Sequence, residues 1–295
     1  MNINATSNVG QAGLKDVEMM NKNKIKQIIL NLFEKRNILI YILAFMLSTV
    51  NSAGENMFFG LSIFAAICSN GIPIGMVYLI TILGTLIGFG REKLLLYMIT
   101  SLVFIVLTLM YRPKSDYENR NEKQKLGLLL FLSIIIVNIG KMFFSMFLLY
   151  DLLVTITTAI ESYIFYKIFA NSVAVLSEIN IKKAFSIEET MGVTLTVAIA
   201  IAAISSLQIL GIEIRSVLSI LLVLIMGWKN GMLVGATSGI TIGTVFGIIA
   251  GGDPIIIAIY GLSGMLAGLL NRFRKNRSSS RIYNRKYNSY ICCIR

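Results

Sequence analysis

Histidine is absent from this chain of 295 residues, and cysteine and proline occur only three times each. The lack of histidine and the shortage of cysteine leave little for zinc or disulfide chemistry. Cys68 stands alone in an apolar stretch, and Cys292 and Cys293 are adjacent. We therefore assign no metal, cofactor or redox role to the residues of this chain.

Charged residues are also scarce, at 14% of the chain, whereas 56% of the residues are hydrophobic. This balance is typical of a protein whose solvent is largely lipid. The sequence has no glycine-rich phosphate-binding loop, no HExxH motif and no GxSxG motif. Its largest internal polar loop, residues 112–125, is too short for an enzyme domain, so this chain is predicted not to be an enzyme.

Apolar stretches recur from Ile38 to Leu270, and a helix needs about 20 such residues to cross a bilayer. Unbroken runs of Leu, Ile, Val, Ala and Gly favour helices over the alternating segments of a barrel. We expect an all-α fold, a polytopic transmembrane helical bundle of about eight to ten spans. The lower count applies if the first two spans, which are short, form a re-entrant pair. The candidate spans are Ile38–Ser52, Met57–Asn70, Ile72–Gly90, Leu94–Tyr111, Leu126–Met146, Leu148–Leu176, Thr190–Leu210, Val217–Trp228, Gly231–Ala250 and Ile255–Leu270.

The segments before the spans are polar and basic. Residues 1–21 are predicted to be a disordered cytoplasmic N-terminus without a cleavable signal. Residues 22–36 place lysines beside an apolar stripe at helical spacing, which indicates a basic amphipathic juxtamembrane helix on the anionic leaflet, or simply the polar end of the first span. The multi-span membrane domain is expected over residues 37–273.

The net charge of +12 is explained better by membrane topology than by a nucleic-acid partner, because the excess of basic residues lies in loops and tails. If the N-terminus is cytoplasmic, the opposite side of the membrane carries only Arg91, Lys93 and Arg215. The cytoplasmic loops then hold Arg112, Lys114, Arg120, Lys123, Lys125, Lys182, Lys183, Lys229 and Arg272. Both termini are therefore predicted to lie inside the cell.

Glycines recur at every fourth position near the end of the predicted membrane domain. They are Gly231, Gly235, Gly239, Gly243 and Gly247, followed by Gly264 and Gly268 in the next span. Glycines four residues apart share one side of a helix and let another backbone approach closely in lipid. This pattern predicts a helix-packing centre, which could also support a homo-oligomer. The alternative is a pair of thin helices that slide to gate a pathway.

Four ionisable residues fall within an apolar region: Lys141, Asp151, Glu161 and Lys167. Charges at membrane depth are candidates for a proton relay or a substrate site. The alternative is structural, because Asp151 is expected near a turn between spans, and lysines can reach the interface by snorkelling.

Ser186 and Glu189 have the S-x-x-E spacing of a capping box just before a long apolar run. The pattern predicts a helix that begins directly after Ser186. A catalytic carboxylate pair at Glu188 and Glu189 is less favoured, because adjacent helical residues point in different directions.

Several passages, in this order and spacing, resemble the amino-terminal membrane region of the stage II sporulation protein E family. They are FFGLSIFAAI at 58–67, SIEET at 186–190, VLSIL at 217–221 leading into the glycine repeat, and YGLSGMLAGLLNRF at 260–273. The resemblance implies a multi-span anchor in the cell membrane at the polar division septum.

In that family the anchor is followed by a region that associates with the tubulin-like division protein and by a serine phosphatase dependent on manganese or magnesium. The resemblance implies that this phosphatase acts on an anti-anti-sigma factor and thereby activates the forespore sigma factor. This chain has no positions that match the family's metal-binding aspartates, so no catalytic residue is carried over. The binding regions for both protein partners are expected to be absent.

The last segment, residues 274–295, holds five arginines and two lysines, which supply seven of the twelve net positive charges. One interpretation is a genuine basic tail that binds lipid or RNA. The other, which we prefer, is a tail read out of frame, because suitable codons shifted by one base encode another apolar segment. A different overall alternative is a small membrane transporter or transporter subunit, although no inverted repeat is visible in the sequence.

Overall fold

The structure is a computed structural model that describes residues 35–50, 57–111, 120–144, 149–178, 186–204, 208–209, 212–250 and 254–292. Contacts between Cα atoms divide the chain into two compact units, Met1–Ile42 and Leu43–Arg295. The described part of the first unit is the beginning of one helix, and all packing reported below lies within the second unit. The predicted N-terminus at 1–21 and most of the predicted amphipathic helix at 22–36 fall outside the described residues.

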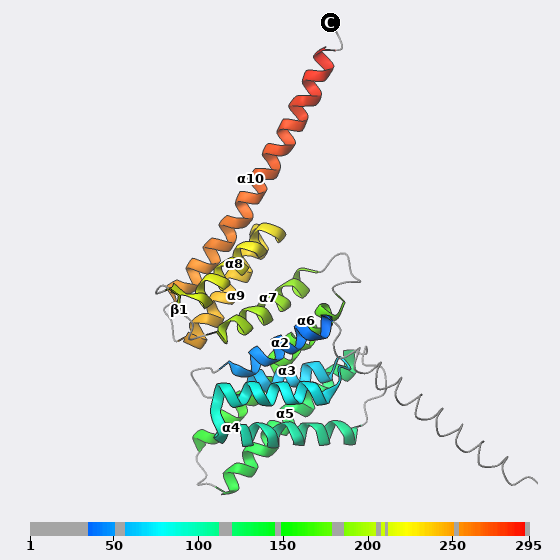
Figure 1. Cartoon of the computed structure of the whole chain (residues 1–295), viewed down its shortest axis with the longest axis vertical. Helices are drawn as coiled ribbons and strands as arrows, with labels where there is room; N and C mark the ends of the chain where they lie inside the picture. Colours follow the sequence, from blue (N-terminus) through cyan, green and yellow to red (C-terminus); the bar gives the residue numbers. More distant parts are fainter. Residues whose placement is uncertain are drawn as a thin grey trace, which may run out of the picture. The chain divides into compact units, whose positions relative to one another are not determined.

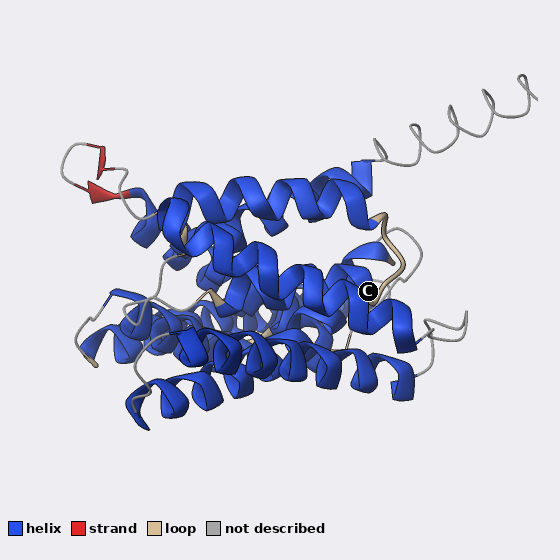
Figure 2. Ribbon diagram, turned by 90° about the horizontal axis from the view of Figure 1, so that it is seen from below, coloured by secondary structure: helices blue, strands red, loops and turns tan. Residues whose placement is uncertain are grey.

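The described residues are almost entirely helical, as Figures 1 and 2 show. The helices are α2 (Lys35–Thr49), α3 (Phe58–Cys68), α4 (Ile74–Tyr111), α5 (Arg120–Phe144), α6 (Leu149–Ser177), α7 (Ile187–Ala202), α8 (Ile214–Asn230), α9 (Met232–Ala250) and α10 (Ile255–Cys292). One small antiparallel sheet pairs β1 (Gln208–Ile209) with β2 (Ile212–Glu213) between α7 and α8. The helical class expected from the sequence is thus confirmed.

Every predicted apolar segment overlaps a helix, and α4 contains two of them. Five segments are long and apolar enough to cross a membrane: Ile74–Arg91, Lys93–Tyr111, Glu122–Phe143, Leu149–Ser177 and Ile255–Arg274. Three apolar helices are shorter, Asn37–Thr49, Phe58–Cys68 and Met232–Gly247. The count of eight to ten spans therefore remains a prediction.

The predicted span Thr190–Leu210 is wrong at its end, because α7 stops at Ala202 and a short β-hairpin follows. In this hairpin Gln208 pairs with Glu213 across the two strands. Two polar side chains placed opposite each other can interact across a strand pair, an arrangement that an apolar helix does not provide. A window of apolar residues alone does not reveal this change.

Gly90 divides α4 into two helices that fold back on each other. Its backbone dihedral angles, φ 76° and ψ −172°, are non-helical and suit glycine. The ring of Phe64 in α3 lies 5.8 Å from the ring of Tyr78 and 6.1 Å from the ring of Phe104. A continuous helix would separate Tyr78 from Phe104 by about 39 Å, so the two halves must form a hairpin.

Helix α3 is the most deeply buried helix in the first half of the described chain, with every residue from Phe58 to Ile67 buried. It contacts α4, α5 and α6. Ser62 Oγ donates to the carbonyl oxygen of Ser162 at 2.9 Å, and Asn70 Nδ2 donates to that of Ala170 at 3.1 Å. Because both bonds join residues 100 positions apart, α3 and α6 run parallel in a fixed register.

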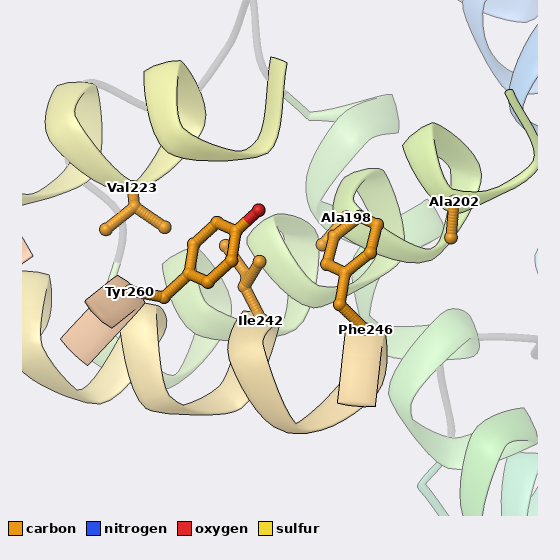
Figure 3. Packing of buried hydrophobic residues seen from close by; sticks show 6 residues of the cluster. All are labelled: Ala198, Ala202, Val223, Ile242, Phe246 and Tyr260. Atoms are coloured by element: carbon orange, nitrogen blue, oxygen red, sulfur yellow. The ribbon is translucent and has the colours of Figure 1, made fainter. Parts of the chain in front are cut away.

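The later helices, α7 to α10, share a second core (Figure 3). Its buried side chains converge from all four helices and are Ala198, Ala202, Val223, Ile242, Phe246 and Tyr260. The rings of Phe246 in α9 and Tyr260 in α10 stack with centroids 6.0 Å apart and planes inclined by 7°. Offset aromatic stacking of this kind adds to apolar packing and holds the two helices in register.

The predicted capping box is confirmed at the start of α7. The backbone N–H of Glu189 donates to Ser186 Oγ at 3.1 Å, and the backbone N–H of Ser186 donates to Glu189 Oε2 at 2.9 Å. These bonds satisfy two amide groups that the first helical turn would leave unpaired. Ser186 and Glu189 therefore serve as a helix boundary.

Candidate functional site

Lys141 and Asp151, two of the predicted intramembrane charges, line one cavity of about 940 Å³. The cavity lies between α3, α4, α5 and α6, and Lys93 of α4 also lines it. Lys93 and Lys141 belong to different helices, whereas Asp151 lies in the first turn of α6. The structure therefore brings three charged residues from three helices to one cavity.

The cavity wall is mixed in character. Polar groups come from Thr100, Asn138, Tyr150, Thr155 and Thr158, and apolar groups from residues such as Met57 and Leu61. Two lysines and one aspartate give the wall a formal charge of +1. A wall with two ammonium groups, one carboxylate and several hydroxyls can hold an anion or a zwitterion through charge-assisted hydrogen bonds.

Glu161, the third predicted charge, does not line this cavity. It lies ten residues beyond Asp151 on α6, about 15 Å further along the helix axis. Its Oε2 atom is buried and has no hydrogen-bond partner among the residues that the structure describes. The structure thus joins Lys141 with Asp151 and leaves Glu161 apart, so a relay through all three has no geometric support.

Lys167 is exposed, and its Nζ lies 4.5 Å from the centre of the Tyr163 ring. A long lysine that rests on an aromatic ring at the protein surface is the arrangement expected of a snorkelling side chain. This geometry favours the structural interpretation for Lys167.

A polar network at the other end of α3 was not expected from the sequence. Lys123 Nζ donates to Asn70 Oδ1 at 3.1 Å, and the hydroxyl of Tyr166 donates to the carbonyl oxygen of Lys123 at 2.7 Å. Together with the bond from Asn70 to Ala170, these contacts tie α3, α5 and α6 together. The sequence identifies Lys123 only as one of the basic residues that indicate topology, because nothing in it links Lys123 to residues 53 and 43 positions away.

The repeated glycines lie where α9 meets α10. A Cβ added to Gly235 would overlap the carbonyl oxygen of Gly264, and one added to Gly239 would overlap the carbonyl oxygen of Tyr260. A Cβ on Gly243 would lie 2.7 Å from Ile257 Cα. A Cβ on Gly268 would overlap the backbone of Met232. The two backbones therefore approach too closely for any side chain at these positions.

Two members of the repeat have a different setting. No described residue lies within 4 Å of a Cβ added to Gly247, and Gly231 adopts a φ of 95° at the C-terminal end of α8. Gly227 of α8 was missed, although it continues the same four-residue spacing, and a Cβ there would overlap the carbonyl oxygen of Gly264. Gly227, Gly235 and Gly264 thus bring three helices of one chain together.

Among the residues that the structure describes, no group of three or more histidine, cysteine, aspartate or glutamate side chains could hold a metal ion. Cys68 is a free cysteine. Among the described residues, Lys93, Lys141 and Asp151 line one cavity, where they offer ionic and hydrogen-bonding contacts.

A family model described as "SpoIIE, N-terminal domain" matches residues 2–280 of the chain. Comparisons with curated proteins and with solved structures gave no significant match. The matched region contains the cavity, the polar network around Asn70 and the glycine contacts.

Proposed function

The chain belongs to the SpoIIE N-terminal domain family, and on this premise we propose that it is the membrane-anchoring region of a sporulation protein. The observation that carries the proposal is the family match, which extends from residue 2 to residue 280. Five helices long and apolar enough to cross a membrane agree with an anchor. We propose that the anchor places its protein at the asymmetric division septum.

The proposed role of the anchor is positional. In this proposal it serves a serine phosphatase that dephosphorylates an anti-anti-sigma factor and requires manganese or magnesium, with the tubulin-like division protein as a septal partner. We assign none of this chemistry to residues of this chain. The closely packed contacts of α8, α9 and α10 support a rigid anchor, because interfaces rich in glycine hold helices together in lipid.

Septal placement can be tested by imaging. The whole chain, fused to a fluorescent protein, is expressed during sporulation of an endospore-forming bacterium, beside an unrelated protein with a similar number of spans. We expect the fusion to concentrate at the polar septum while the control spreads over the whole membrane. An even distribution of both proteins would refute the septal role.

A small transporter is the second candidate, and the cavity of about 940 Å³ with Lys93, Lys141 and Asp151 favours it. Polar cavities lined by charged residues are where transporters bind solutes. The test is uptake of radiolabelled amino acids and inorganic anions into proteoliposomes that contain the full chain. Uptake that is lost in an Asp151→Asn variant would support transport, and uptake no faster than in empty liposomes would remove this candidate.

A further inference from the structure

A groove of about 810 Å³ runs along the outer side of α8 and α10, remote in sequence from the charged cavity. Its walls include Leu224 and Ile225 of α8 and Leu266 and Leu270 of α10, whose exposed fractions lie between 39% and 61%. Such exposure of large aliphatic side chains suits contact with lipid chains. We call this feature, with its apolar walls, the α8–α10 groove.

One end of the groove is cationic. Lys229 and Arg274 line it there, and Lys229 also lines an adjoining hollow of about 690 Å³ together with Arg272. All three side chains are exposed and form no ion pair with any residue that the structure describes. None of the residues lining either hollow is acidic. The cationic end is therefore open to an anion.

At the cationic end of the groove, contacts join α8 to α10. Asn271, which lines both hollows, donates through Nδ2 to the carbonyl oxygen of Trp228. The guanidinium of Arg274 lies 4.7 Å from the centre of the Trp228 ring. A tryptophan beside cationic residues at the end of apolar helices is the usual composition of a membrane interface.

The length of the groove fits one leaflet of a bilayer. Along α10 its lining extends from Ser263 to Arg274, a rise of about 17 Å. Half of a hydrocarbon core is about 15 Å thick. An acyl chain can therefore lie on the apolar walls while its headgroup reaches the cationic end.

We propose that the α8–α10 groove binds one anionic phospholipid, with its phosphate between Lys229 and Arg274 and one acyl chain along Leu224, Ile225, Leu266 and Leu270. Charge complementarity selects an anionic lipid over a zwitterionic one. The topology predicted from the basic loops puts Lys229 and Arg272 on the cytoplasmic side, where the leaflet is negatively charged. This inference goes beyond the anchor role and does not depend on sporulation.

Trp228 provides a direct probe, because it is the one tryptophan in the whole sequence and it lines the groove. The full chain is reconstituted in vesicles in which a fixed fraction of either phosphatidylglycerol or phosphatidylcholine carries brominated acyl chains. Bromine quenches tryptophan fluorescence only at short range. We expect brominated phosphatidylglycerol to quench Trp228 at several-fold lower mole fraction than brominated phosphatidylcholine.

The variant test removes the cations while keeping a polar side chain at each position. Replacing both Lys229 and Arg274 by glutamine should lower the preference for phosphatidylglycerol by roughly fivefold per charge. Arg91→Gln, which removes an exposed cation from α4, is the matched control and should leave the preference unchanged. If a variant fails to fold, titration of the native chain with the two brominated lipids still tests the proposal.

Three results would overturn the proposal. Equal quenching by the two brominated lipids would show that the groove does not select charge. A preference that survives in the Lys229→Gln and Arg274→Gln double variant would place the anionic lipid elsewhere. Quenching by neither lipid would show that protein, such as a second copy of the chain, covers Trp228.

Discussion

Gly235 of α9 lies directly against the carbonyl oxygen of Gly264 in α10, and a Cβ on either glycine would overlap the other's backbone. Gly227 of α8 approaches the same carbonyl oxygen. Since these glycines already face helices of their own chain, a homo-oligomer formed through the same faces would have to displace α10. Any glycine-mediated oligomer is therefore expected to use a different surface.

Replacing Gly235 by alanine should destabilise the membrane domain, because the new methyl group must push α10 away. Overpacking of this kind costs about 1–3 kcal/mol. Gly247→Ala is the matched control on the same helix, since no described residue would contact the added Cβ. That control should be neutral or stabilising by up to about 1 kcal/mol, because alanine favours the helix more than glycine does.

The measurement for both variants is unfolding of the purified protein by increasing SDS in mixed micelles. A lower midpoint for Gly235→Ala together with an unchanged or higher midpoint for Gly247→Ala is the expected pair of results. Equal midpoints would mean that α9 and α10 are not packed as closely as the structure has them.

The hairpin within α4 predicts a conformational cost at Gly90. Its φ of 76° and ψ of −172° fall in a region that essentially only glycine occupies, so Gly90→Ala should destabilise by about 1–3 kcal/mol. Gly75→Ala on the same helix should not destabilise, because no atom of the described residues lies within 4 Å of the added Cβ. Thermal unfolding in detergent, followed by circular dichroism, compares them, and a Gly90→Ala variant as stable as the native chain would argue against the turn.

How far the sequence predicts this fold depends on whether a feature is local. The helix start after Ser186 and the break near Gly90 were predictable, because both depend on residues within one turn. The cavity was only half predictable, since Lys141 and Asp151 stand out in apolar sequence, whereas Lys93 lies in what reads as a loop. The β-hairpin at Gln208 and Glu213 was missed because its strands are only two residues long.

Contacts between distant helices could not be predicted at all. Nothing in the sequence pairs Ser62 with Ser162 or Lys123 with Asn70, because such pairs are set by how helices pack in three dimensions. The spacing of Gly227 was visible in the sequence, yet its contact with Gly264 follows only from the parallel placement of α8 beside α10.

Ser62→Ala tests the register of α3 against α6. Ser62 Oγ is buried and donates to the carbonyl oxygen of Ser162, so its loss should cost about 0.6 kcal/mol, the average for interhelical hydrogen bonds in membranes, and at most about 1.7 kcal/mol. Thr157→Ala removes an exposed hydroxyl that bonds only to the backbone of its own helix, and it should have almost no effect. SDS unfolding of the two variants under one protocol gives the comparison, and equal small effects would contradict the register.

The predicted topology can be checked on α5, where Lys125 and Lys141 are separated by about 24 Å along the helix axis. With Cys68, Cys292 and Cys293 replaced by serine, Lys141→Cys should react with a membrane-impermeant maleimide in intact cells. Lys125→Cys should react only after the cells are permeabilised. If intact cells label Lys125→Cys but not Lys141→Cys, the orientation of the chain is the opposite of the one predicted.

The most direct test of the account is a domain exchange in sporulating cells. The membrane region of a SpoIIE-family phosphatase is replaced by the whole of this chain or, as control, by an unrelated protein with a similar number of spans. Activity of the forespore sigma factor is read from a reporter gene. We predict that the chimera with this chain restores compartment-specific reporter activity and that the control does not, whereas failure of the well-expressed, membrane-inserted chimera would contradict the role as a sporulation anchor.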